Sequence, residues 1–296
     1  MVRQSSGETA MTRGHERPGS RTRRTGARVL AFAALALALA APGAGSARAE
    51  EMAFDPAQWP FTAIGKLNVV TGPGSRQFCT ATLIGPRLAL TAAHCLWDKA
   101  RGRWVEPGSV HFVAGYAQGA YLAHAIGNAV HKPADYAYAY GTSRPNMSGD
   151  WALIELASPI PIKPLELEHL AAPDDPRKLR LDIRRAGYRR TMSQTMSAQD
   201  KCAARLAPDP APLLIHDCRA IPGESGSALL QVEDGSPKVI GVLVAGPRPG
   251  APPGPSFAVP TRAFLAAAEE ILKRQGARDD AGREAGKAGD PQTALP

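Results

Sequence analysis

Short apolar runs separated by turn residues characterise the chain between Phe61 and Leu156. The clearest runs are 63–67, 80–84, 88–91, 110–114 and 151–156, and Gly- and Pro-containing segments lie between them. Short strands with such regular punctuation are typical of antiparallel barrels and sandwiches. The pattern returns at 213–216, 227–232, 239–244 and 256–259, after a Pro-rich linker at 158–164. The sequence therefore predicts an all-β fold with two strand-rich halves.

A single helix is expected near the C-terminus, where Thr261 could serve as its N-cap. Apolar residues then recur at helical spacing, namely Phe264, Leu265, Ala268, Ile271 and Leu272. This pattern predicts a helix over about 261–275. Residues 276–296 are charged, rich in small side chains and without apolar periodicity, which predicts a disordered tail.

The positive charge of the chain is concentrated at its N-terminus. The 296 residues carry a formal charge of +8, of which residues 1–49 contribute +6 and residues 50–296 contribute +2. Such a nearly neutral domain lacks the basic surface of a nucleic-acid-binding protein, so no nucleic acid is expected as a partner. Apolar residues make up 44% of the chain and charged residues 21%, which is the composition of a globular protein with a core.

Residues 1–49 have the pattern of a signal peptide with an N-terminal extension. An Arg-rich stretch at 21–28 precedes an uncharged run at 29–41, and Ala47-Arg48-Ala49 offers a small-x-small cleavage pattern. The uncharged run is shorter than the ~20 residues that span a bilayer. An uncleaved anchor or a buried helix is the alternative, and Arg23-Arg24 leaves twin-arginine export open. We expect a secreted or periplasmic protein with its domain at 50–275 and no membrane contact after signal removal.

Four cysteines form two pairs with the same spacing. Cys79 and Cys95 are 16 residues apart, and so are Cys202 and Cys218. An exported chain can keep disulfide bonds, although four cysteines allow three connectivities and the spacing selects none of them. The sequence lacks the clustered Cys and His residues that are typical of zinc sites, so neither a metal nor a cofactor is expected.

Three segments carry candidate chemistry. They are Thr91-Ala92-Ala93-His94-Cys95, the segment Gly149-Asp150 before an apolar run, and Gly223-Glu224-Ser225-Gly226-Ser227. A Ser hydroxyl needs a neighbouring base to act as a nucleophile near neutral pH, His suits that role, and a carboxylate can orient the imidazole. Taken singly, the histidine could belong to a core, and the Asp and Ser could belong to turns. Asp135 is the alternative carboxylate, but it lacks the apolar strand that follows Asp150.

Together, these segments resemble the chymotrypsin/trypsin-like serine peptidase family. The resemblance is strongest to its bacterial secreted, glutamyl-endopeptidase-like branch, whose nucleophile motif ends in Ser-Gly-Ser, and it covers residues 61–273. It implies two antiparallel six-stranded β-barrels, at about 61–156 and 177–260, followed by the C-terminal helix. The order His-Asp-Ser distinguishes the chain from α/β-hydrolases, which run Ser-Asp-His.

The resemblance also implies roles for the candidate residues. Ser225 would be the nucleophile, His94 the general base and acid, and Asp150 the carboxylate that orients His94. The backbone N–H groups of Gly223 and Ser225 would form the oxyanion hole.

The family places a disulfide bond beside the catalytic histidine, which implies a bond between Cys79 and Cys95. Cys202 would then pair with Cys218 and brace the segment that leads to Ser225. Bonds that close loops of this length contribute about 3 kcal/mol each.

One departure from the family concerns activation. The sequence contains no basic residue followed by an Ile-Val-Gly-Gly-like segment, which in trypsin-like relatives becomes a new N-terminus and pairs with the acid before the nucleophile. That acid would be Glu224. We therefore expect activity to be independent of such an ion pair and to need at most removal of the signal or a short lead-in.

Further departures concern the substrate pocket, for which the candidates are Arg219, Ala220, Val244, Ala245 and Gly246. Val244 stands where many family members carry a Ser whose hydroxyl contacts the catalytic Asp. The carboxylate at the base of the family's pocket cannot be placed. An Arg219 that points into the pocket would favour acidic P1 residues, whereas one that points outward would not. We expect a small or apolar P1 residue.

The sequence thus predicts an exported, monomeric serine endopeptidase that cleaves polypeptides through an acyl-enzyme on Ser225. The alternative from another class is a catalytically silent binding module that keeps the protease fold. An esterase that uses the same residues is a third possibility, which casein and short-acyl esters would separate from a peptidase.

Overall fold

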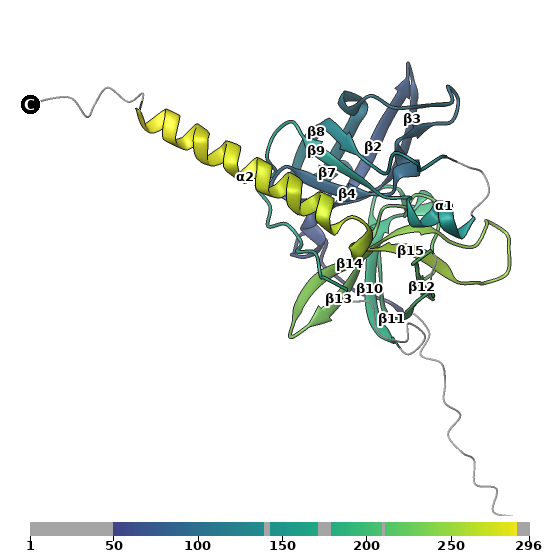
Figure 1. The fold of residues 1–296 in the computed structure, drawn as a ribbon. Helices are drawn as coiled ribbons and strands as arrows, with labels where there is room; N and C mark the ends of the chain where they lie inside the picture. The colour runs from purple at the N-terminus through teal and green to yellow at the C-terminus, as the bar shows by residue number, and fades with distance from the viewer. Residues whose placement is uncertain (1–49, 139–142, 171–178, 209–210, 289–296) are drawn as a thin grey trace, which may run out of the picture. The chain divides into compact units, whose positions relative to one another are not determined.

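Two closed β-barrels form the body of the protein (Figure 1). A computed structural model describes residues 50–288, with gaps at 139–142, 171–178 and 209–210. The expected signal peptide at 1–49 and the last residues, 289–296, lie outside the described residues. The double-barrel fold predicted from the sequence is confirmed.

Six antiparallel strands close the first barrel in the order β2, β3, β4, β9, β8, β7. Their bounds are β2 (Ile64–Gly72), β3 (Ser75–Gly85), β4 (Leu88–Thr91), β7 (Val110–Ala114), β8 (Ala123–His131) and β9 (Ala152–Leu156). The fully buried side chains Leu67, Leu83, Leu90, Phe112 and Ile154 belong to its core. Short elements precede or connect these strands: η1 (Phe61–Ala63), η2 (Ala93–Leu96), β5 (Trp97–Asp98), β6 (Arg103–Trp104), η3 (Pro107–Ser109) and α1 (Arg144–Ser148).

The second barrel follows the order β11, β10, β13, β14, β15, β12, and pairing of β11 with β12 closes it. Its strands are β10 (Leu181–Tyr188), β11 (Met196–Leu206), β12 (Leu214–His216), β13 (Ala228–Glu233), β14 (Ser236–Ala245) and β15 (Ser256–Pro260). A short turn, η5 (Arg190–Met192), follows β10. The lead-in strand β1 (Glu50–Glu51) pairs with β11 on the outside of the closed ring.

The C-terminal helix differs from its prediction at both ends. The turn η6 (Thr261–Ala263) precedes α2 (Leu265–Ala288), and the Thr261 hydroxyl donates to the Glu168 carbonyl at 2.7 Å instead of capping the helix. Phe264, Ala268 and Ile271 are buried as their spacing predicts. The helix continues through residues 276–288, so the expected disordered tail is wrong for that stretch. Ala, Arg, Glu and Lys favour helix without a buried face, and apolar periodicity detects only the buried part.

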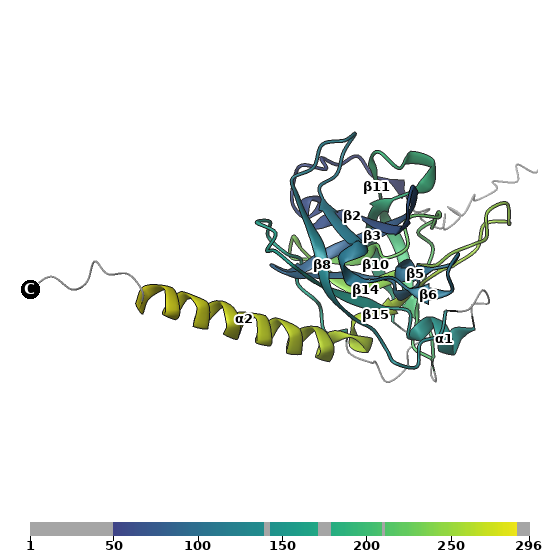
Figure 2. The same cartoon turned by 90° about the horizontal axis from the view of Figure 1, so that it is seen from above.

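The first turns of α2 pack against the first barrel (Figures 1 and 2). The Trp151 and Phe264 rings lie 5.9 Å apart, and Leu272 fills the space beside Gly85. No helix in the described part of the chain is long and apolar enough to cross a membrane.

Candidate active site

Pairing of β4 with β9 brings His94 and Asp150 together. Thr91, at the end of β4, lies opposite Ala152, at the start of β9. His94 lies in η2, just beyond Thr91, and Asp150 lies two residues before the first residue of β9. Two residues that are 56 positions apart in the sequence therefore meet at one end of the first barrel.

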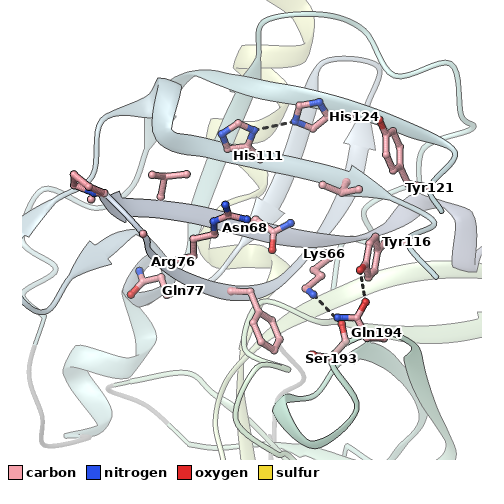
Figure 3. A pocket seen from close by; sticks show the side chains of 16 residues that line it. Lys66, Asn68, Arg76, Gln77, His111, Tyr116, Tyr121, His124, Ser193 and Gln194 are labelled. Carbon is pink, nitrogen blue, oxygen red and sulfur yellow. Dashed lines mark hydrogen bonds between the residues drawn. The ribbon is translucent and has the colours of Figure 1, made fainter. Parts of the chain in front are cut away.

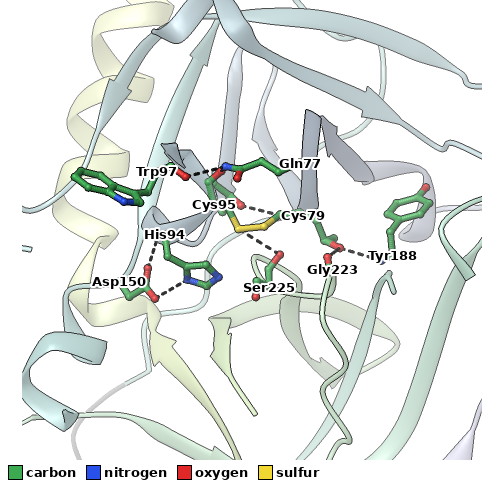
Figure 4. The surroundings of a disulfide bond; sticks show 11 residues. Gln77, Cys79, His94, Cys95, Trp97, Asp150, Tyr188, Gly223 and Ser225 are labelled. Carbon is green, nitrogen blue, oxygen red and sulfur yellow. Dashed lines mark hydrogen bonds and ion pairs between the residues drawn. A yellow bond between two sulfur atoms is a disulfide. The ribbon is translucent and has the colours of Figure 1, made fainter. Parts of the chain in front are cut away.

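Asp150 holds His94 with two hydrogen bonds (Figure 4). Its Oδ2 lies 2.7 Å from the imidazole Nδ1, and its Oδ1 accepts the His94 backbone N–H at 2.9 Å. With Nδ1 bound to a carboxylate, Nε2 is left to exchange protons, as a general base requires. Asp150 is buried, whereas the alternative carboxylate Asp135 is exposed.

Tyr136 makes a further contact with Asp150 that sequence reasoning missed. Its buried hydroxyl forms a hydrogen bond with the Asp150 carboxylate. Burial, and then the neighbouring negative charge, raise the pKa of this hydroxyl, so it stays protonated and donates. Val244 has no hydroxyl that could donate to Asp150, and the Tyr136 hydroxyl donates a hydrogen bond to it instead. A tyrosine in an irregular segment 14 residues before its partner has no pattern that would predict this contact.

Ser225 lies at the seam between the two barrels. It comes from the turn before β13, and its carbonyl oxygen accepts the backbone N–H of Thr80 in β3 at 2.9 Å. The same oxygen lies 3.8 Å from the Sγ of Cys95, next in sequence to His94, and Figure 4 shows the Ser225 side chain on the imidazole side of Asp150. The Ser225 hydroxyl forms no hydrogen bond with another described residue, and catalytic hydrogen bonds often tighten only when substrate binds.

The close approach of the Ser225 turn to the first barrel requires glycine at position 226. Gly226 has a φ of +83°. A Cβ at this position would lie 2.0 Å from the Thr80 carbonyl oxygen and 2.3 Å from the Thr91 Oγ1. Any larger residue would therefore displace the serine from the histidine side of the seam.

The backbone before Ser225 provides two donors that could bind an oxyanion. Gly223 has a φ of +101°, which favours glycine. Its carbonyl oxygen accepts the Thr80 hydroxyl at 3.2 Å. Within the described residues, neither the Gly223 N–H nor the Ser225 N–H donates a hydrogen bond. Two unengaged N–H groups beside a serine match the donors that stabilise a tetrahedral oxyanion.

Glu224 is paired inside the protein with Arg185 of β10. The Arg185 Nη1 lies 2.9 Å from the Glu224 Oε1, and both side chains are only 1% exposed. The same carboxylate also accepts the Ser197 hydroxyl at 2.8 Å and the Ile221 backbone N–H at 2.7 Å. The Glu224 charge is therefore compensated by an internal guanidinium. Sequence reasoning missed Arg185, because a single arginine in a strand does not indicate its partner.

The two disulfide bonds join the pairs that the resemblance implied. Cys79 is bonded to Cys95 and Cys202 to Cys218. In the described residues, the only cluster with the geometry of a metal site is Cys79, His94 and Cys95. Its sulfur atoms are already joined to each other and cannot act as thiolate ligands.

The substrate-pocket candidates separate into two groups. Arg219 and Ala220 line a pocket of about 640 Å³ between the segments 219–222 and 247–254. Val244, Ala245 and Gly246 are not among its lining residues. Gly246 packs directly against Ala220, since a Cβ on Gly246 would lie 2.6 Å from the Ala220 Cβ. The pocket is therefore closed on the side where Ala220 touches Gly246.

Comparisons with known proteins agree with this geometry. The family model described as Trypsin matches residues 52–268. A Glu endopeptidase in complex with MPD is similar, with 18% sequence identity and a TM-score of 0.56, and the match covers 77% of this chain and 98% of that one. The protease Anisep from Arthrobacter nicotinovorans is similar at 19% identity and a TM-score of 0.53, covering 70% of this chain and 96% of that one.

At these identities, the two solved structures establish the fold. No curated protein sequence matches the chain. The family model, in contrast, covers well over half of the residues, and the resemblance seen in the sequence is confirmed. The chain belongs to the trypsin family of serine proteases.

Proposed function

We propose that this protein is an exported serine endopeptidase with Ser225 as its nucleophile. The observation that carries the proposal is the His94 imidazole, held by Asp150 at 2.7 Å, at the seam where Ser225 lies. The proposal assigns complementary roles to His94, Asp150 and Ser225, because a serine hydroxyl needs such a base to react near neutral pH.

The proposed reaction proceeds in two steps. The Ser225 Oγ attacks the scissile carbonyl carbon while its proton passes to the His94 Nε2. The N–H groups of Gly223 and Ser225 donate to the oxyanion, and the imidazolium gives its proton to the departing amine. Water then attacks the acyl-enzyme, with His94 again accepting and returning the proton.

Activation is proposed to need at most removal of the signal or a short lead-in, and no new N-terminus that pairs with Glu224. The internal Arg185–Glu224 pair supports this, because the acid before the nucleophile already has a cationic partner. The lead-in is also part of the fold: Met52 donates its backbone N–H to the Ala198 carbonyl at 3.0 Å, and Phe61 is buried. A cut within 61–66 would disrupt a buried segment.

A small P1 residue is the proposed specificity. The pocket that Ala220 lines is closed on the side where Ala220 touches Gly246, so a long P1 side chain would be blocked at that contact. Arg219 is exposed and lies in the same pocket as Asp217, so its charge is not isolated. Export is proposed from the pattern of residues 1–49, and two disulfide bonds support it.

Hydrolysis of casein and of a peptide library tests the proposal. Wild type is expected to cleave after small residues, and Ser225→Ala to lower kcat roughly 10⁴- to 10⁶-fold. Ser236→Ala, at an exposed position in the β13–β14 hairpin, is the matched control and should retain full activity. Folded wild-type protein that cleaves no peptide would instead indicate a binding module. Cleavage mainly after Arg, Lys or Glu would contradict the small P1 pocket.

A further inference from the structure

A cationic groove lies on the outer face of the first barrel (Figure 3). It has a volume of about 950 Å³ and runs across β2, β3, β7 and β8 to residues 193–194 of the second barrel. We use the term cationic groove for the cavity lined by Lys66, Arg76, Phe78, His111, Tyr116 and His124 together with ten other residues. None of the 16 lining residues is Asp or Glu. The lining therefore carries positive charge without compensation.

Lys66 places an ammonium group at the inner end of the cationic groove. Its Nζ lies 4.8 Å from the centre of the Phe78 ring and 4.7 Å from that of the Tyr116 ring, and it donates to the Ser193 carbonyl at 2.8 Å. The residue is only 8% exposed. Burial lowers the pKa of this amine, because the charged form has lost much of its hydration. A carboxylate in the groove would restore favourable interactions to this charge.

Further donors line the outer part of the cationic groove. Arg76 is exposed, and among the described residues it forms no ion pair. The rings of His111 and His124 stack with their centres 5.2 Å apart. The His111 Nδ1 lies 3.0 Å from the His124 Nε2. Guanidinium and imidazole N–H groups are suited to binding carboxylates.

The inner wall of the cationic groove is held in place by contacts between the barrels. The Tyr116 hydroxyl donates to the Gln194 side chain. The Gln118 backbone N–H donates to the Gln194 carbonyl at 2.7 Å, and the Tyr188 hydroxyl donates to the Tyr116 carbonyl at 2.8 Å. The surface of the groove is therefore formed before a ligand binds, so binding would cost little conformational entropy in the protein.

Strand β3 connects the cationic groove to the candidate active site. Thr80 contacts both Gly223 and Ser225, and Arg76 lies four residues earlier on the same strand, about 13 Å away at ~3.3 Å per residue. The Phe78 ring lies against Gly223, since a Cβ there would be 2.8 Å from the Phe78 Cε2. The pocket lined by Ile221 and Pro222 shares no lining residue with the groove. Both cavities adjoin Gly223, because Pro222 of the pocket precedes it in the chain and Phe78 of the groove packs against it.

We propose that the cationic groove binds an acidic segment of the substrate polypeptide, on the carboxyl side of the scissile bond. This proposal rests on the proposed peptidase function. If the P1 residue occupies the pocket beside Ile221, the chain beyond the scissile bond leaves past Phe78 and enters the groove. A span of about 13 Å corresponds to roughly four extended residues, so the acidic residues are expected about three to five positions after the cleaved bond.

Binding of matched peptides to the full-length Ser225→Ala variant tests the proposal without requiring turnover. One fluorescein-labelled peptide carries Asp and Glu at the third to fifth positions after the scissile bond, and its partner carries Asn and Gln there. Fluorescence anisotropy should show roughly tenfold tighter binding of the acidic peptide at low salt, and this advantage should shrink as ionic strength rises. Arg76→Glu, a change at an exposed position, should remove most of the advantage.

Arg103→Glu is the matched control, because Arg103 is exposed but does not line the groove. It should leave the advantage of the acidic peptide intact. Equal binding of the two peptides, or an equal loss in Arg76→Glu and Arg103→Glu, would overturn the proposal. Binding of a sulfated oligosaccharide together with no preference for the acidic peptide would overturn it in favour of a polysaccharide site. If the groove binds the acidic peptide but wild type cleaves no peptide, the peptidase function would be contradicted. The acidic peptide would still be established as the ligand of the groove.

Discussion

At the residue scale, the candidate site depends on charges that are compensated inside the protein. Asp150 accepts hydrogen bonds from His94 and Tyr136, and Glu224 accepts them from Ser197 and Ile221 while it pairs with Arg185. A buried carboxylate without such partners would be strongly destabilising. The stability of the buried Glu224 therefore depends on Arg185, 39 positions earlier in the sequence.

Removal of Arg185 tests this dependence. Arg185→Met leaves the Glu224 carboxylate buried and unpaired, so we expect the free energy of unfolding to fall by about 3–5 kcal/mol. Activity should also fall, because the turn that carries Ser225 loses its anchor. Urea denaturation and peptide hydrolysis provide the two measurements.

The neighbouring Arg184 supplies the control for that experiment. Arg184 pairs with Asp200 at 2.8 Å, but the two side chains are 24% and 29% exposed. Solvent screens such a pair, so Arg184→Met should cost about 1 kcal/mol or less. Equal losses of stability in the two variants would show that the Arg185–Glu224 pair has no special role.

At the scale of elements, the docking of α2 on the first barrel depends on Glu155 of β9. The Glu155 carboxylate accepts from Arg274 at 2.9 Å and from Gln275 at 3.1 Å, and it lies 2.7 Å from the Nε2 of His131. Burial opposes ionisation of Glu155, but the bonds from Gln275, His131 and Arg274 outweigh it and lower the pKa of the carboxyl. The charged carboxylate therefore holds the helix to the barrel.

Acidification should loosen this contact. Because the pKa of Glu155 is lower in the folded protein, its stabilisation is complete above the ordinary value of 4.5 and is lost as the pH falls through the folded-state pKa. We expect the free energy of unfolding of wild type to exceed that of Glu155→Gln at pH 7, and the difference to shrink as the pH falls below 4.5. Glu270→Gln should have little effect, since the Glu270 side chain is 79% exposed. A difference that stays constant with pH would contradict the assignment.

The sequence predicts those elements whose pattern reflects burial. Both barrels, and the buried part of α2 up to Ile271, follow from apolar runs and helical spacing. The extension of α2 beyond Gln275 has no such pattern, and the sequence does not predict it. The pairing of β4 with β9 is also not visible in local sequence, so the proximity of His94 and Asp150 was reached through a family resemblance.

The same reasoning explains which parts of the site the sequence did not predict. Motifs identify residues within one short segment, such as Gly223 to Ser227. Tyr136, Arg185 and Lys66 act through tertiary contacts across barrels or loops, and a single polar residue in a strand or loop carries no signal of its partner.

At the scale of the whole molecule, one buried histidine makes stability depend on pH. His216 of β12 is 2% exposed, and neither of its ring nitrogens has a hydrogen-bond partner among the described residues. Burial, and then the charge of Arg185, lower the pKa of His216 to about 3. The folded protein therefore keeps this imidazole neutral, whereas the unfolded chain protonates it near its ordinary value of 6.5.

The free energy of unfolding should fall as the pH drops from about 6.5 towards 3, because the unfolded state binds the extra proton. His216→Leu should flatten this part of the profile without loss of stability at pH 7, since no hydrogen bond is removed. His169→Leu, at an exposed position, should leave the slope unchanged. A slope that persists in His216→Leu would assign the dependence to other groups.

The most direct test of the central claim is covalent labelling of the folded protein with a fluorophosphonate, followed by peptide mass spectrometry. The account predicts one adduct, on Ser225, that disappears in Ser225→Ala and forms far more slowly in His94→Ala. Folded protein that takes up no label, or label on another residue that persists in Ser225→Ala, would contradict it.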